Sequence, residues 1–184
     1  MNYLMKRLIF FVIIIILVSG CATFQAKREF LPDNIFVCNI PTLRVKLSSD
    51  FVYTEAYDKK LVTKDQGNDS GFGRTTTSTY EYFVWQNKDK SKLTIIQIST
   101  LQDPTWSYNG SGFSQKYEKQ YKVETLGGDK WNTLIRHDST IHKECSHAKV
   151  YARIGISSNM MVKIYYLSKT TKNFTPDTDI TIIN

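Results

Sequence analysis

Over most of the chain, hydrophobic and polar positions alternate with the two-residue period of β-strands. Leu43, Val45 and Leu47 alternate with basic residues, as expected for a strand that has one buried face. Residues 76–86 and 92–101 are both rich in β-branched and aromatic residues, and only a short polar link separates them. Two such runs with a short link between them predict a β-hairpin.

The same kind of pattern recurs in the rest of the chain. It predicts further strands over residues 50–56, 131–136, 148–156, 160–167 and 180–183. Residues 58–74 are polar and contain glycine, which predicts a long loop. Most neighbouring strands are joined by short turns, whereas parallel pairing needs connections of a dozen or more residues. We therefore expect a mostly antiparallel sheet.

One segment favours a helix instead. Phe113, Tyr117 and Tyr121 recur every four residues with charged residues between them, and a Gly-Gly pair follows as a stop signal. We therefore expect a helix over residues 113–124, and a strand over residues 121–125 is the competing interpretation. The predicted fold class is α+β, a mostly antiparallel β-sheet with about one main helix. The alternative is an all-β sandwich or barrel.

The first residues of the chain follow a different pattern. Residues 8–18 form an unbroken apolar run directly after Lys6 and Arg7. A basic start followed by a short apolar stretch is typical of a secretory signal peptide. A membrane-spanning helix needs about 20 apolar residues, whereas this run of eleven residues rises only about 16 Å as a helix. The run alone is therefore too short to span a bilayer.

The end of this leader reads Val18, Ser19, Gly20, Cys21. It resembles the lipobox of bacterial lipoproteins, in which an aliphatic residue and two small residues precede a cysteine. The resemblance implies that the chain is cut before Cys21, that the Cys21 sulfur carries a diacylglycerol, and that acyl chains such as palmitate hold the protein in the cell envelope. Ala22, in place of an aspartate, implies an outer-membrane location facing the periplasm if the cell is Gram-negative.

These features predict three parts of the chain. Residues 1–20 are a cleaved signal peptide, residues 21–34 are the lipidated cysteine with a flexible tether, and residues 35–184 are a single globular domain. The tether residues after Cys21 would span about 20 Å as a flexible coil. The length that remains is normal for one domain with its own hydrophobic core.

The net charge bears on the expected partners. The whole chain carries a formal charge of +7, and removal of the leader with Lys6 and Arg7 leaves about +5. A basic protein can bind nucleic acid, but an exported lipoprotein rarely meets it, so we expect no nucleic-acid partner. The membrane, reached through the lipid anchor, and an envelope protein or cell-wall component are the expected partners.

Two cysteines remain when Cys21 is lipidated, and they invite a disulfide. Cys38 and Cys145 would be an even pair in an oxidising compartment. Their bond would close a loop of about 107 residues, for which chain entropy assigns about 4–5 kcal/mol of stabilisation. The alternative is two buried or unpaired thiols.

The histidines provide a competing use for Cys145. All three histidines lie within residues 137–147, together with that cysteine. Imidazole and thiolate are zinc ligands, which makes His142, Cys145 and His147 a candidate metal site in a loop between two strands. Their spacing matches no common zinc motif, and Cys145 cannot both ligate a metal and form a disulfide. A solvated polar loop is the alternative.

Trp106 and Tyr108 form the second candidate site, in a turn-rich loop over residues 102–112. An aromatic pair on a loop can stack on sugar rings or on a peptide from the cell wall. The alternative is that Trp106 folds back against the edge of the core. The glycines of residues 67–73 match neither the P-loop nor the dinucleotide fingerprint, and the chain has no GxSxG motif. We therefore expect no cofactor and identify no catalytic residue.

Taken together, the sequence predicts a membrane-anchored envelope lipoprotein that acts as a non-catalytic binding or structural module for a protein or a cell-wall component. The alternative is a metal-dependent or hydrolytic envelope enzyme that uses the loop over residues 137–147.

Overall fold

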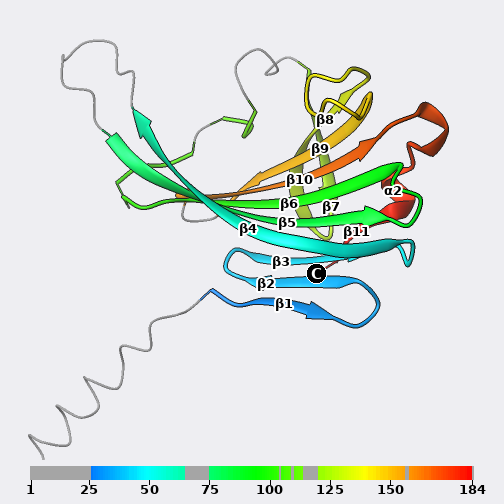
Figure 1. Ribbon diagram of the computed structural model, residues 1–184. Coiled ribbons are helices and arrows are strands. Elements are labelled where there is room, and N and C mark those ends of the chain that lie inside the picture. The colour runs from blue at the N-terminus through cyan, green and yellow to red at the C-terminus, as the bar shows by residue number, and fades with distance from the viewer. Residues whose placement is uncertain are drawn as a thin grey trace, which may run out of the picture.

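A computed structural model of the protein describes residues 26–64, 75–103, 105–108, 110–113, 120–155 and 158–183. In this part of the chain, two antiparallel β-sheets pack on each other (Figure 1). The four-stranded sheet contains, in spatial order, β1 (Arg28–Leu31), β2 (Ile35–Asn39), β3 (Thr42–Leu47) and β11 (Ile180–Ile183). The lipobox residues and Cys21 lie outside the described residues.

The seven-stranded sheet forms the second layer. Its spatial order is β4 (Phe51–Lys64), β5 (Thr75–Asn87), β6 (Lys92–Leu101), β10 (Met160–Ser168), β9 (His147–Ile154), β8 (Asp129–Arg136) and β7 (Lys122–Leu126). Most strands pair with their neighbours in sequence, and the pairing of β6 with β10 joins the two halves of the sheet. The predicted hairpin over residues 76–101 is confirmed as β5 and β6.

The inner faces of the two sheets form the core. The largest side chains that are almost completely buried there include Phe36, Val45 and Leu47 from the four-stranded sheet, and Phe51, Trp85, Ile96, Ile98, Trp131, Val162, Ile164 and Tyr166 from the seven-stranded sheet. Full burial of each large aliphatic or aromatic side chain contributes about 1.5–3 kcal/mol. The alternation predicted around Leu43 is confirmed, since β3 shows strictly alternating exposed and buried residues.

The predicted mostly antiparallel sheet is confirmed, but the structure fits the alternative, an all-β sandwich, better than the predicted α+β class with one main helix. The described residues contain one short α-helix, α2 (Pro176–Asp179), and one 3-10 turn, η2 (Thr171–Asn173). Both sheets have open edges, so neither closes into a barrel. Strand pairing across the sequence, rather than helical spacing, decides the architecture.

The helix expected over residues 113–124 shows why. Residues 114–119 lie outside the described residues, and the last part of the segment is strand β7, paired in register with β8. Val123 pairs with Asn132, as the competing strand interpretation predicts. Gly127 and Gly128 have φ angles of 56° and 80° and form the two-residue hairpin turn between β7 and β8. That turn requires positive φ at both positions, so the Gly-Gly pair is a hairpin signal here rather than a helix stop.

Two boundaries also differ from the prediction. β1 lies within the segment predicted as a flexible tether. Its residues are held by the domain, since Phe30 packs on Tyr53 with ring centroids 4.4 Å apart and Arg28 forms an ion pair with Glu81. β4 continues to Lys64, into the segment predicted as a loop, because it pairs with β5 along its whole length. Among the described residues, no helix is long and apolar enough to cross a membrane.

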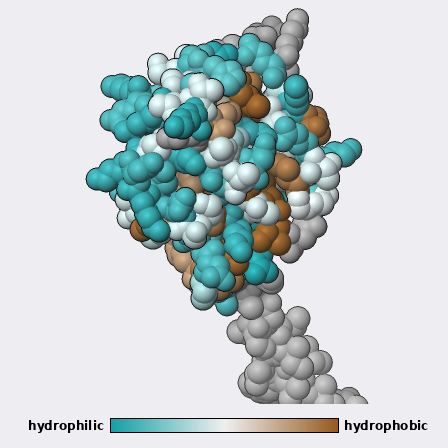
Figure 2. All heavy atoms as spheres, turned by 90° about the vertical axis from the view of Figure 1, so that its right-hand side faces the viewer, coloured by the Kyte–Doolittle hydropathy of each residue, from teal (hydrophilic) through white to brown (hydrophobic). Residues whose placement is uncertain are grey.

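The C-terminal segment closes one end of the sandwich. Ser48, at the end of β3, donates its backbone N–H to the carbonyl oxygen of Asp179. The Asp179 carboxylate accepts hydrogen bonds from the Tyr166 hydroxyl at 2.6 Å and from the Lys92 ammonium at 2.7 Å. Figure 2 shows this end of the molecule, where hydrophilic side chains surround small hydrophobic groups.

Candidate functional site

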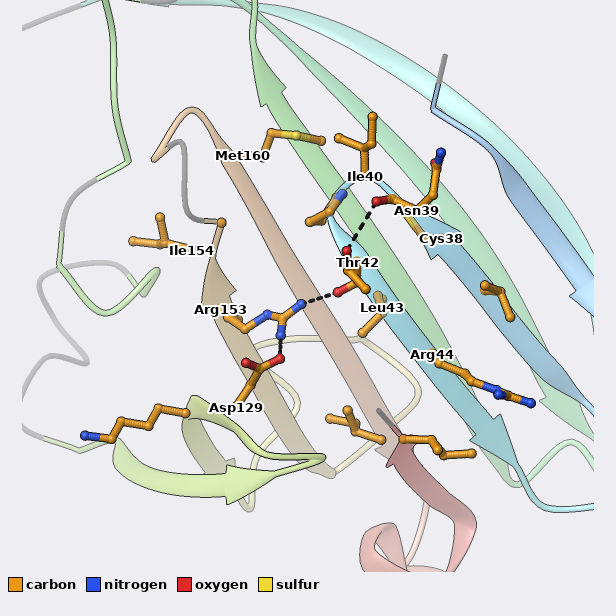
Figure 3. Close-up of a pocket in the computed structure, with 16 residues that line it drawn as sticks. Cys38, Asn39, Ile40, Thr42, Leu43, Arg44, Asp129, Arg153, Ile154 and Met160 are labelled. Atoms are coloured by element: carbon orange, nitrogen blue, oxygen red, sulfur yellow. Dashed lines mark hydrogen bonds and ion pairs between the residues drawn. The ribbon is translucent and has the colours of Figure 1, made fainter. Parts of the chain in front are cut away.

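A cavity of about 930 Å³ lies at the opposite end of the sandwich, where β3 begins. The turn between β2 and β3 forms one wall, and the ends of β9 and β11 and the starts of β8 and β10 form the others (Figure 3). The antiparallel pairs that end at Asn39 and Thr42 force a tight turn there. The cavity lies between this turn and the seven-stranded sheet.

Most of the cavity lining is apolar and comes from both sheets. The apolar lining residues that matter here are Val37, Ile40, Leu43, Ile154, Met160 and Ile182. Ligand sites in proteins are typically concave, mainly apolar and about 300–1,000 Å³ in volume, with a few polar groups that orient the ligand. The size and lining of this cavity fit that description.

Arg153 crosses the cavity wall and connects the two sheets. Its guanidinium donates a hydrogen bond to the backbone carbonyl of Thr42 and forms an ion pair with Asp129 (Figure 3). It also lies over the Trp131 ring, 4.9 Å from the ring centroid. These three contacts use most of the capacity of this cation, so Arg153 holds the wall of the cavity in place.

Two other cations in the lining differ from Arg153. Arg44, on β3, and Lys130, on β8, are exposed, and neither forms an ion pair within the described part of the chain. The only carboxylate among the lining residues is Asp129, which Arg153 already neutralises. Uncompensated positive charge therefore lies at the outer side of the lining rather than in the apolar interior, and Figure 3 shows the Arg44 side chain pointing away from Arg153 and Asp129.

Cys38 also lines the cavity, and its thiol belongs to the buried core. Its side chain is almost completely buried, and the Arg28 guanidinium donates a hydrogen bond to its sulfur at 3.0 Å. Burial raises the pKa of the Cys38 thiol above its usual value, and the charge of Arg28 offsets only part of that effect. A raised pKa disfavours the thiolate, which is the reactive form of cysteine, and the Cys38 side chain packs in the core between the sheets.

The disulfide expected between Cys38 and Cys145 is not formed in the structure. Both residues are free thiols. Cys38 lies in the main core between the sheets, whereas Cys145 packs with Ala148 and Leu167 in a separate cluster. Burial raises the pKa of Cys145 as well. Counting cysteines predicted a pair, but the sheets place the two sulfurs in different clusters.

The structure also does not bring His142, Cys145 and His147 together as metal ligands. His142 and Cys145 face each other across an isolated β-bridge. The two ring nitrogens of His147 instead meet the hydroxyls of Ser146 at 2.8 Å and Thr171 at 2.9 Å. No group of three or more His, Cys, Asp or Glu side chains in the described ranges is placed to hold a metal ion.

Trp106 and Tyr108 are half-buried and do not line the cavity. The backbone N–H of Tyr108 donates to the carbonyl oxygen of Ser158 at 2.6 Å, which ties the loop to the turn before β10. The Trp106 indole nitrogen is buried and has no hydrogen-bond partner among the described residues. Burial raises the pKa of the Tyr108 phenol, and the Ser99 hydroxyl beside it acts in the opposite direction. Both rings thus turn toward the protein.

Sequence reasoning missed the residues that shape the cavity. Arg44 reads as the solvent-facing position of an alternating strand, which it is, and nothing local indicates that a ligand space lies beside it. Arg153 and Thr42 are separated by 111 positions in the chain, so their contact leaves no signal in the sequence. Only the stacking of the two sheets brings these residues together.

No family model matches the chain, and neither a curated protein nor a solved structure shows significant similarity to it. The cavity and the chemistry of its lining are therefore the features that point to a function.

Proposed function

We propose that this protein is an envelope lipoprotein that binds an acidic lipid in the cavity, with the acyl chain inside and the anionic head group at the rim. The observation that carries this proposal is the combination of an apolar cavity of about 930 Å³ with the uncompensated cations Arg44 and Lys130. An acidic lipid fits both features. Its acyl chain is apolar like the cavity lining, and its negative head group is attracted by the two cations.

The apolar lining would supply most of the affinity. Removal of apolar surface from water is worth about 25 cal/mol per Å², and a chain between Leu43 and Ile154 would contact both sheets. The cations would mainly orient the ligand, since exposed ion pairs contribute about 0.2–1 kcal/mol each. Arg44 has the further property that a guanidinium can bind a carboxylate or phosphate through two parallel hydrogen bonds.

The predicted location supports the same ligand class. The lipobox-like end of the leader and Cys21 favour a protein tethered to a membrane surface, where acidic lipids are abundant. The positive charge of the mature chain, about +5, favours an anionic partner. This proposal narrows the sequence-based hypothesis of a non-catalytic binding module, and it makes the ligand a lipid rather than a protein or a wall polymer.

Photo-labelling of the full chain in lipid nanodiscs tests the proposal. A fatty acid that carries a diazirine in its chain is the probe, and mass spectrometry locates the labelled peptides. We expect labels in residues 37–44 and 153–160. An uncharged monoacylglycerol with the same diazirine chain should label these peptides several-fold less, because its head group lacks the charge that Arg44 and Lys130 attract.

A matched pair of variants sharpens the experiment. Arg44→Glu with Lys130→Glu reverses both rim charges and should reduce labelling by about fivefold or more. Lys46→Glu reverses one charge two residues along β3, outside the cavity lining, and should leave labelling unchanged. Labelling outside the cavity, or equal loss in both variants, would refute a lipid site here.

A further inference from the structure

β4 is the exposed edge strand of the seven-stranded sheet. Among the described strands it pairs only with β5, and every residue from 52 to 62 is exposed. Figure 1 shows its C-terminal part rising away from the four-stranded sheet. Such an edge presents unpaired backbone N–H and C=O groups, which can pair with a strand of another chain.

Two features of β4 restrict which strand can pair with it. A β-bulge interrupts the register between Tyr53 and Glu55, and Lys59 and Lys60 place positive charge on the edge. Bulges and lysines are both common means of preventing unwanted edge pairing. From Glu55 onward, however, β4 pairs with β5 without a further register shift, so a regular edge remains available.

When two copies of this regular edge pair antiparallel, opposite charges can face each other. In a two-fold antiparallel pair, directly opposite residues have side chains on the same face of the continuous sheet. The two-fold axis must therefore lie midway between the two copies of one residue. With the axis at Tyr57, Glu55 of each copy lies opposite Lys59 of the other, and this pair occurs twice. An axis at Asp58 or at Lys59 would place two like charges opposite each other. Like charges directly opposite are destabilising, whereas opposite charges stabilise a strand pair.

We propose that β4 pairs antiparallel with β4 of a second copy of this chain, with the two-fold axis at Tyr57. The paired sheets then form one continuous sheet across two molecules. Glu55 and Lys59 form no ion pair or side-chain hydrogen bond within the described part of the chain, so both are available to the second copy. This interface uses a surface separate from the cavity and does not depend on the proposed lipid ligand.

Aromatic and apolar side chains add to the same register. The Tyr57 ring already stacks on Tyr82 with centroids 4.7 Å apart and an interplanar angle of 17°. Opposite residues have Cβ atoms about 4.5–5.5 Å apart, so the Tyr57 rings of the two copies would meet and extend this stack across the axis. Val52 and Val62, which are 53% and 68% exposed, flank the paired segment and would lose water-exposed surface.

Cysteine cross-linking of the full chain in detergent or nanodiscs tests the register. Opposite residues in an antiparallel pair have Cα atoms about 4.5–5.5 Å apart, which a disulfide can bridge. Tyr57→Cys should therefore give a covalent dimer under mild oxidation. Val123→Cys is the matched control, because Val123 is 60% exposed on β7, the opposite edge of the same sheet. The wild-type chain reports any background from Cys21.

Charge reversal tests the partner. Glu55→Lys and Lys59→Glu each turn two attractive pairs into two repulsive ones, and each should weaken the dimer by roughly tenfold. An equimolar mixture of the two variants should restore dimers, because each Glu55→Lys chain then faces a Lys59→Glu chain. The double exchange in one chain should also restore them. Sedimentation analysis of these samples provides the readout.

Each result decides the matter. Dimers of the wild type, a cross-link only at Tyr57→Cys, and recovery in the mixture support the interface. The interface would be overturned if the wild type were monomeric or if cysteines at both edges gave cross-links. It would also be overturned if the charge reversals left dimerisation unchanged.

Discussion

At one end of the sandwich the carboxylate of Asp179 joins the layers, and at the other end the guanidinium of Arg153 does so. Asp179 is buried and accepts hydrogen bonds from the Tyr166 hydroxyl, the Lys92 ammonium and the Thr175 hydroxyl. Arg153 is half-buried, and its guanidinium meets a backbone carbonyl, the face of the Trp131 ring and Asp129, whose side chain is 53% exposed.

This difference explains why one end is closed and the other holds a cavity. Three donors around a buried carboxylate leave no room between the layers, and Tyr166 and Phe174 pack beside them with ring centroids 5.8 Å apart. At the open end, the long side chain of Arg153 connects the two layers, and apolar space remains beside it. The comparison indicates that the closed end contributes stability and the open end contributes a binding space.

The largest expected effect is at the closed end. Asp179→Ala would leave the Lys92 ammonium and its neighbouring hydroxyls without their shared acceptor. Removal of one partner of a buried ion pair costs about 3–5 kcal/mol, which we expect as a loss of unfolding free energy in urea titrations. Asp177→Ala is the control, since the Asp177 side chain is 76% exposed and Glu124 still faces Lys149. That variant should lose no more than about 1 kcal/mol.

A smaller effect is expected at the open end. Arg153→Met keeps an unbranched apolar stem but removes the guanidinium and its contacts with Thr42 and Asp129. Because Asp129 stays in contact with water, we expect a loss of about 1–2 kcal/mol in the same titrations. A loss as large as that of Asp179→Ala would contradict the distinction between the two ends.

The buried thiols report local opening at each end. Cys38 lies beside Arg153, and Cys145 lies in the loop that packs near η2. Opening of a local region governs the reactivity of buried groups. In Arg153→Met we expect iodoacetamide to alkylate Cys38 about tenfold faster, with Cys145 unchanged, as mass spectrometry of the intact variants can measure. Equal acceleration at both thiols would mean that the ends do not open independently.

The smallest effect concerns an exposed carboxylate near the closed end. Hydrogen bonds from Thr140 and Arg136 lower the pKa of Asp138 to about 2. A carboxyl with a lowered pKa stabilises the fold above its unfolded pKa, near 4, and this stabilisation is lost as pH falls toward 2. NMR titration should place the Asp138 pKa near 2, and Asp138→Asn should be less sensitive to pH in this window. A pKa near 4 would show that these hydrogen bonds do not form in solution.

The strands of this fold differ in how well the sequence pattern predicts them. The hairpin of β5 and β6 followed from two apolar runs and a polar link, because both strands lie in the chain close to their partner. The spacing of Phe113, Tyr117 and Tyr121 misled the prediction for residues 122–124, since alternation and pairing with β8 prevailed there. The polar residues of β4 read as a loop because an edge strand exposes both faces, and its composition then lacks the apolar alternation that marks a strand.

The candidate site was less predictable than the fold. Cys38 and Cys145 were paired on the basis of their number, and the histidines were grouped on the basis of their proximity in sequence. Neither the number of cysteines nor the spacing of the histidines contains information about which face of which sheet a residue occupies. The cavity depends on that information, because Arg44, Lys130 and Arg153 come from three separate strands.

The sequence by itself determined the strand-rich character of the chain, the β5–β6 hairpin and the alternation of β3, because these follow from neighbouring residues that must bury one face and pair locally. The expectation of a lipid anchor at Cys21 also belongs to the sequence alone. The tertiary structure decided the pairing of β6 with β10, the free edge of β4, the separation of the two thiols and the cavity under the β2–β3 turn. Each of these depends on contacts between residues far apart in the chain, whose cost in chain entropy is met only when the whole core forms.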